Sequence, residues 1–139
     1  RELPSLEWSG GAVEGTVRGP GAEPLGYRED VGRHNAVDKT AGWMLATGVS
    51  GADKLLYTTG RLTSEMVIKC AQMGIAALAS RSGFTAWGVE IANQIDLTLI
   101  GRLRGQRFMC LSGEARLIRD ADPSSVREEP KKSSRKAAK

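Results

Sequence analysis

The spacing of hydrophobic positions predicts an extended segment and then a long helix in the first half of the chain. Residues 25–29 have the composition of a short strand. After them, apolar and small residues recur at the intervals of one helix face, namely Ala36, Val37, Thr40, Ala41, Met44 and Leu45. Gly48 follows, and glycine readily ends a helix in the left-handed conformation. We therefore predict a helix that ends at Gly48.

A second strand and helix follow at once. Residues 55–59 are a compact run of strand formers. Thr63 is suited to cap the next helix, and Leu62 and Val67 are placed to pack across its first turn as a hydrophobic staple. Gly74 is the predicted end of this helix.

The pattern continues with one more helix and three more strands. Residues 75–79 are apolar on both faces, as in a buried parallel strand, and residues 97–101 repeat this composition. Between them lies a predicted helix that carries Trp87, Ile91, Ala92 and Ile95. Residues 107–111 form a last strand, antiparallel to its predecessor because the turn at residues 104–106 is too short for a crossover.

Strands that alternate with helices over short loops indicate an α/β protein, a layered sandwich with a mixed, mostly parallel sheet. Residues 1–24 are rich in Gly and Pro and are predicted to be a loop-rich N-terminal remnant with room for one hairpin. Residues 25–119 are the predicted α/β domain, and residues 120–139 are predicted to be a basic, disordered tail.

The formal net charge of +4 is located at the end of the chain. Residues 127–139 carry six basic residues against two acidic ones, which leaves 14 of each in residues 1–126. Residues 1–126 carry no excess of positive charge that would favour nucleic acid. The three tryptophans are too dispersed in the chain to form a platform on which bases could stack. We expect Trp43 and Trp87 to be partly buried, and we expect no nucleic-acid partner. A binding role of the tail ranks third among the functions considered.

Other features of the chain concern its location in the cell and the chemistry of its cysteines. No apolar run approaches the roughly 20 residues that span a bilayer, and no secretory signal is visible, so we expect a cytoplasmic protein without a membrane partner. Cys70 and Cys110 lack metal-ligand spacing and are predicted to be packed, free thiols. We expect no metal site.

Five arginines follow the predicted strands, where ligands of α/β sheets bind. They are Arg61, Arg81, Arg102, Arg104 and Arg107. Two of the loops that carry them lead into helix N-termini, whose backbone N–H groups suit phosphate. This pattern favours an anionic ligand, while solvated loop arginines remain the alternative.

Four segments resemble one protein family. Residues 29–39 read E-D-V-G-R-H-N-A-V-D-K, and residues 60–69, 82–90 and 97–108 agree in order and spacing. Over roughly residues 25–118 the chain resembles the formate dehydrogenase accessory sulfurtransferases, the FdhD family. The fold that this implies is similar to that of cytidine deaminases.

The resemblance implies a function. Such a protein accepts persulfide sulfur from a cysteine desulfurase and delivers it to molybdenum bis-molybdopterin guanine dinucleotide, a client destined for formate dehydrogenase. The turn that would bind this client consists of Leu103, Arg104, Gly105, Gln106, Arg107 and Phe108. To these we add Arg61, from the basic pattern, and His34, from the signature. Oligomeric state, with a homodimer as one option, is left open.

The chain departs from the family in two places. The Cys-x-x-Cys pair that holds the persulfide is absent, so we assign no catalytic residue. In the element T-G-G-x-H-A-A, Val13 stands in place of His. The chain is then a fragment or the product of a degenerate gene. Two functions follow: a sulfurtransferase completed by an upstream cysteine loop, or a truncated, non-catalytic module that binds molybdopterin or guanine nucleotides.

The roles of several single residues are open to more than one interpretation. His34 either contacts the ligand, as a general acid or hydrogen-bond donor, or makes a structural hydrogen bond. Asp30 is expected to cap the helix that follows it rather than to form a catalytic pair with Asp38. Glu65 is explained by the helix dipole or by an ion pair with Arg61. Zinc deaminase chemistry is excluded, because it needs H-x-E and P-C-x-x-C motifs that the chain lacks.

Overall fold

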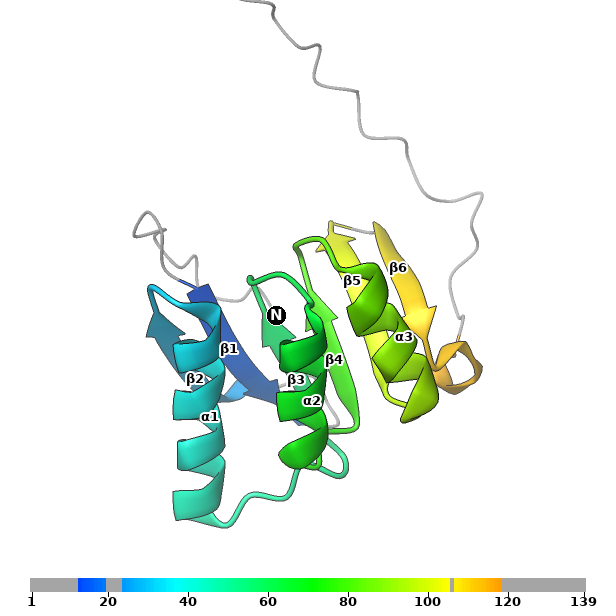
Figure 1. Cartoon of the computed structure of the whole chain (residues 1–139). Helices are drawn as coiled ribbons and strands as arrows, with labels where there is room; N and C mark the ends of the chain where they lie inside the picture. Colours follow the sequence, from blue (N-terminus) through cyan, green and yellow to red (C-terminus); the bar gives the residue numbers. More distant parts are fainter. Residues whose placement is uncertain (1–12, 20–23, 106, 119–139) are drawn as a thin grey trace, which may run out of the picture.

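The computed structural model describes residues 13–19, 24–105 and 107–118, and these form one six-stranded sheet with helices on one face (Figure 1). The predicted tail at residues 120–139 lies outside the described residues. The elements are β1 (Val13–Arg18), β2 (Pro24–Asp30), α1 (Arg33–Thr47), β3 (Leu55–Thr58), α2 (Ser64–Gln72), β4 (Ala77–Ser80), α3 (Ala86–Gln94), β5 (Thr98–Arg104) and β6 (Arg107–Ser112), followed by a short 3-10 helix (Glu114–Arg116).

The strand order is β2-β1-β3-β4-β5-β6. The central strands β3, β4 and β5 pair in parallel, whereas β1 pairs antiparallel with β2 and β3, and β6 pairs antiparallel with β5. The predicted mixed α/β sheet is therefore confirmed. It is less parallel than expected because antiparallel hairpins form both of its flanks.

The first strand forms, with β2, the hairpin for which the expectation at residues 1–24 left room. The structure differs in its place, because β1 lies inside the sheet, between β2 and β3. Val17 on this strand is fully buried, and a Cβ on Gly15 would lie 2.9 Å from Oγ1 of Thr40 in α1. This central place was not predicted, because glycines supply part of the core face of β1 and the alternation of apolar and polar side chains is weak.

The core lies between the sheet and the helices. Leu56 is opposite Val17 on one side and Leu78 on the other, and Leu78 is opposite Leu99, so one row of buried side chains crosses four strands. The helices cover this row with Val37, Met44, Met66, Val67, Cys70 and Ala92, all nearly or fully buried. Such a continuous buried row fixes the register, because a slip of one residue would expose the whole row.

The predicted helices are confirmed in existence and differ in detail. α1 buries Ala36, Val37, Thr40 and Met44 and ends at Gly48 with a left-handed φ of 68°. Leu45, predicted on the buried face, is 86% exposed because it lies one residue around the helix from Met44. In the same way Trp87 is 65% exposed rather than partly buried, since α3 packs through Gly88 and Ala92. Trp43 is half-buried as expected.

The surroundings of two helical glycines predict that the same substitution, glycine to alanine, has opposite effects on stability. A Cβ on Gly42 of α1 would meet nothing within 4 Å, so Gly42→Ala should stabilise the fold by about 0.5–1 kcal/mol through helix propensity. A Cβ on Gly88 of α3 would lie 2.7 Å from the carbonyl oxygen of Leu62, so Gly88→Ala should destabilise it by about 1–3 kcal/mol. Urea unfolding of both variants measures the difference. Equal effects would show that α3 is not packed tightly on the loop at Leu62.

Candidate functional site at the carboxyl edge of the sheet

Strands β2, β3, β4 and β5 run in one direction, so their carboxyl ends and the N-termini of α1, α2 and α3 lie along the same edge of the sheet (Figure 1). We call this edge the rim and define it as residues 31–34, 59–63, 81–85, 102–105 and 107–108. In the part of the chain that the structure describes, no helix is long and apolar enough to cross a membrane. The described residues also contain no group of three side chains suited to a metal.

Hydrogen bonds join the loops of the rim to one another. The N–H of Leu62 donates to the carbonyl of Gly83 over 3.0 Å, and the N–H of Thr85 donates to the carbonyl of Leu62 over 3.1 Å. On the other side, the N–H of Arg102 donates to the carbonyl of Ser82 over 3.0 Å. The Ser80 hydroxyl donates to the carbonyl of Gly60 over 2.6 Å. The loops after β3, β4 and β5 therefore form one connected surface.

The structure brings the five predicted arginines of the rim together at this edge. All five are exposed, and none of them makes an ion pair among the described residues. Arg104 donates from Nε to the carbonyl of Arg81 over 3.3 Å, which leaves its terminal nitrogens available. The guanidinium of Arg102 lies 5.7 Å from the centre of the Phe84 ring. Unpaired positive charge in this number favours an anionic ligand.

The N-termini of α1 and α2 add backbone donors to this charge. Neither N-cap residue, Gly32 or Thr63, makes a side-chain capping hydrogen bond, whereas Thr85 caps α3 by accepting from the N–H of Gly88. Oγ1 of Thr63 and Nε of Arg33 are buried and have no partner among the described residues. The uncapped N-terminus of α2 is suited to phosphate or carboxylate oxygens.

His34 connects these two helix ends. Its Nε2 lies 3.1 Å from Oε2 of Glu65, so a side chain in the first turn of α1 meets one in the first turn of α2. The structure thus gives Glu65 a partner other than the expected Arg61. The contact gives His34 a polar partner within the protein, and a ligand contact of His34 stays a prediction. Residue types alone offered no signal for this pair.

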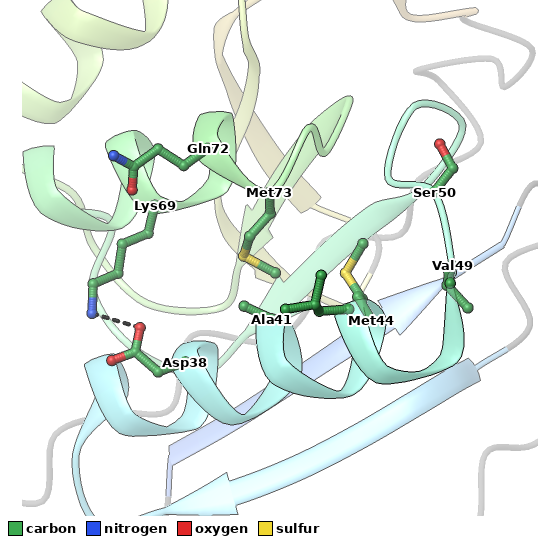
Figure 2. A pocket seen from close by; sticks show the side chains of 10 residues that line it. Asp38, Ala41, Met44, Val49, Ser50, Lys69, Gln72 and Met73 are labelled. Atoms are coloured by element: carbon green, nitrogen blue, oxygen red, sulfur yellow. Dashed lines mark hydrogen bonds and ion pairs between the residues drawn. The ribbon is translucent and has the colours of Figure 1, made fainter.

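A second concave feature lies away from the rim. A groove of about 520 Å³ between the later turns of α1 and the end of α2 is lined by Asp38, Ala41, Met44, Leu45, Gly48, Val49, Ser50, Lys69, Gln72 and Met73. Figure 2 shows Met44 and Met73 in this groove and the ion pair between Asp38 and Lys69, 2.8 Å long, at one end. Since Lys69 is already paired, the groove has no free cation for a polyanionic ligand. Sequence reasoning did not find it.

Comparisons with known proteins agree with this architecture. The sequence model of the FdhD/NarQ family matches residues 7–118. The chain belongs to this family. A relative named sulfur carrier protein FdhD from Geobacillus kaustophilus is 41% identical over 96 residues, which are 69% of this chain and 36% of the relative. Another of that name from Listeria monocytogenes is 36% identical over 77% of this chain and 41% of its own length. This chain therefore spans less than half of these relatives.

A solved structure gives the same result. The crystal structure of a putative formate dehydrogenase accessory protein from Desulfotalea psychrophila is 36% identical to this chain, with a TM-score of 0.72. The match covers 78% of this chain and 46% of that one. The resemblance drawn from residues 29–39 and the later segments is thus confirmed at the level of family and fold.

The family signature folds as a turn organised by Asp30. Oδ1 of Asp30 accepts from the N–H of Gly32 over 3.1 Å and from Nδ2 of Asn35 over 3.3 Å, and Oδ2 lies 2.6 Å from Nζ of Lys39. These donors, Lys39 first, lower the pKa of Asp30 from 3.8 to about 2. Asp38 instead pairs with Lys69. The two carboxylates therefore do not form a pair, as expected. The prediction that Asp30 caps α1 is wrong, because Gly32 is the N-cap residue and Asp30 instead holds the turn before the helix.

Neither cysteine of this family member lies on the rim. Cys70 is fully buried in α2, and burial raises the pKa of its thiol to about 12. Cys110 in β6 is only half-buried, less than predicted, and its Sγ donates to the carbonyl of Ser112 over 3.4 Å. Both thiols are free, as predicted.

The Asp30 turn predicts an acid dependence of stability. A carboxylate whose pKa is lowered in the folded state stabilises it at every pH above its ordinary value of 3.8, and this contribution is lost as pH falls toward 2. Asp30→Asn should therefore lower the melting temperature at pH 7, and the difference from the parent chain should shrink between about pH 4 and pH 2. Thermal unfolding by circular dichroism measures it. Glu90→Gln, at an exposed position of α3, is the control, and an equal loss in both variants would contradict the account.

Proposed function

We propose that this chain is the cofactor-binding part of a formate dehydrogenase accessory protein, and that it binds molybdenum bis-molybdopterin guanine dinucleotide at the rim. The cofactor is a client of the protein and not its own catalytic group. Family membership supports the general role, and the name sulfur carrier protein FdhD borne by relatives supports sulfur delivery. The rim supplies the observation on which the choice of ligand rests: five exposed arginines without ion pairs among the described residues.

The chemistry of the ligand fits the chemistry of the rim. The guanine dinucleotide ends of the client carry pyrophosphate groups, and each charge-assisted hydrogen bond to phosphate contributes roughly 1.5–3 kcal/mol. Arg104 and Arg107 at the two ends of the β5–β6 turn are the proposed phosphate contacts. The N–H groups at the start of α2, beside Arg61, are suited to the same oxygens.

The remaining assigned residues shape the turn. Gly105 has a positive φ of 55°, which glycine adopts without strain and which closes the β5–β6 hairpin. Phe108 is 51% exposed, so its ring is available to a nucleobase, and Leu103 is half-buried beneath the turn. Gln106 lies outside the described residues, so its proposed role rests on the family resemblance alone. His34, held by Glu65, is the proposed contact from α1.

Sulfur delivery also requires a thiol that can carry the sulfur as a persulfide. A persulfide forms when a thiolate attacks the terminal sulfur of a donor persulfide, such as that of a cysteine desulfurase, and releases the donor thiolate. Neither thiol of this chain fits that step, since Cys70 is buried with a raised pKa and Cys110 is half-buried with its Sγ donating to the carbonyl of Ser112. In the proposed role, another thiol carries the sulfur to the client held at the rim, for use by formate dehydrogenase. A binding module without turnover is the second candidate, and the same two thiols favour it.

GDP, which represents the guanine nucleotide end of the client, should bind to the chain and give saturable heat in calorimetry. Replacement of Arg104 and Arg107 together by Ala should weaken binding by about tenfold or more, since one charge-assisted bond of roughly 1.5 kcal/mol corresponds to that factor. Lys69→Ala in the groove between α1 and α2 is the matched charge control and should bind as the parent chain does.

Two results would contradict the assignment. If GDP gives no saturable heat at millimolar concentration while circular dichroism shows an intact fold, the rim is not a guanine nucleotide site. If the double variant binds as tightly as the parent while Lys69→Ala does not, the ligand occupies the groove instead.

The chain itself should not accept sulfur. Incubation with a cysteine desulfurase and cysteine should leave the native protein without an added sulfur, about 32 Da by mass spectrometry, because Cys70 is buried with a raised pKa and Cys110 is half-buried. Cys110→Ala distinguishes the two sites, since Cys110 is the more accessible. A desulfurase-dependent adduct that disappears in Cys110→Ala would contradict the interpretation that this chain carries no sulfur.

A further inference from the structure

One residue of β5 has a backbone conformation that strands rarely contain. Arg102 has a φ of 50°, in the left-handed region that side chains with a Cβ disfavour. In the described part of the chain Asp96 is the other non-glycine residue with positive φ, and it follows the end of α3, where such residues are common. Around Arg102 the pairing of β5 with β6 shifts register, between Gly101 and Arg104. A left-handed arginine inside a strand persists only where its surroundings determine it.

Apart from the pairing of Arg104 with Arg107 of β6, the contacts of residues 102–104 fall on the loop after β4. The N–H of Arg102 donates to the carbonyl of Ser82, and two residues later Nε of Arg104 donates to the carbonyl of Arg81. The Arg102 guanidinium lies over the ring of Phe84, and its Nη2 would be 3.9 Å from a Cβ on Gly83. Residues 102–104 therefore attach the β5–β6 turn to residues 81–84, which are bonded in turn to Leu62.

We propose that Arg102 is a positioning residue, which acts through its left-handed backbone rather than through its charge. The conformation turns the strand so that Arg104 lies against the loop after β4, where its Nε donates to the carbonyl of Arg81, and Arg107 is paired with Arg104 across the hairpin. The guanidinium of Arg102 is occupied by Phe84 and makes no contact with the ligand. This inference rests on the proposed binding of guanine nucleotide at the rim.

Substitutions that separate backbone from charge test the proposal. Arg102→Gly removes the guanidinium but adopts positive φ freely, whereas Arg102→Val removes it and resists that conformation because it is branched at Cβ. In calorimetry with GDP, we expect Arg102→Gly to bind within about twofold of the parent chain and Arg102→Val to bind at least about fivefold more weakly.

Arg18 supplies the matched control. It lies on β1, paired with Leu55 at the start of β3, and so at the opposite end of the sheet from the rim, and its φ is not positive. Arg18→Gly and Arg18→Val should therefore bind GDP alike. Equal loss of affinity in both Arg102 variants would show that the guanidinium touches the ligand, and equal retention would show that the conformation is irrelevant. Either result overturns the proposal.

A second measurement tests the positioning role of Arg102 separately from the binding of GDP at the rim. Amide hydrogen exchange should be faster at Arg102 and at residues 82–85 in Arg102→Val than in Arg102→Gly, because the bond to Ser82 is weakened. If the parent chain binds no GDP, the proposed function fails, and equal exchange in the two variants then overturns the positioning role as well. If Arg102→Val does not fold, Arg102→Ala takes its place, with an expected exchange rate between those of the parent chain and an unfolded segment.

Discussion

The pair of backbone hydrogen bonds that Leu62 makes with Gly83 and Thr85 is the constraint on which the rim depends. Leu62 is fully buried, so its N–H and carbonyl must find partners inside the protein, and both partners lie in the loop after β4. Its side chain lies in the core with Val67 of α2. The start of α2 and the start of α3 are therefore fixed relative to each other. Gly88 is part of the same constraint, since only a residue without Cβ lets α3 approach the carbonyl of Leu62 so closely.

From this constraint the rim gains a property useful for binding. Ser82, next to Gly83, accepts the hydrogen bond of Arg102, and Arg81 accepts that of Arg104, so the β5–β6 turn is attached to loops that are already fixed. A ligand that binds between pre-ordered loops loses less affinity to the ordering of the protein. The exposed arginines and the uncapped N-terminus of α2 are thus presented on a rigid base, which is what tight recognition of an anionic ligand requires.

The sequence predicted those parts of the fold whose signals are local. Helical spacing and glycine stops located α1 and α2, runs of apolar residues located β3, β4 and β5, and the direction of parallel strands placed the arginines at one edge. The misses share a cause, which is that the relevant contact lies far away in the chain. The central place of β1 in the sheet was not predicted, because it depends on the packing of Gly15 under Thr40 in α1. The pairing of His34 with Glu65 and the left-handed Arg102 also depend on neighbours that no residue pattern reveals.

In the proposed function, ligands of this chain bind at the rim and not in the apolar groove between α1 and α2. Amide chemical shifts measured by NMR during a GDP titration test it most directly. We expect GDP to shift the amide signals of residues 59–63, 81–85, 102–105 and 107–108, while the signals of Met44 and Met73 in the groove stay unchanged. Perturbations centred on Met44 and Met73, with the loops of the rim unaffected, would contradict it.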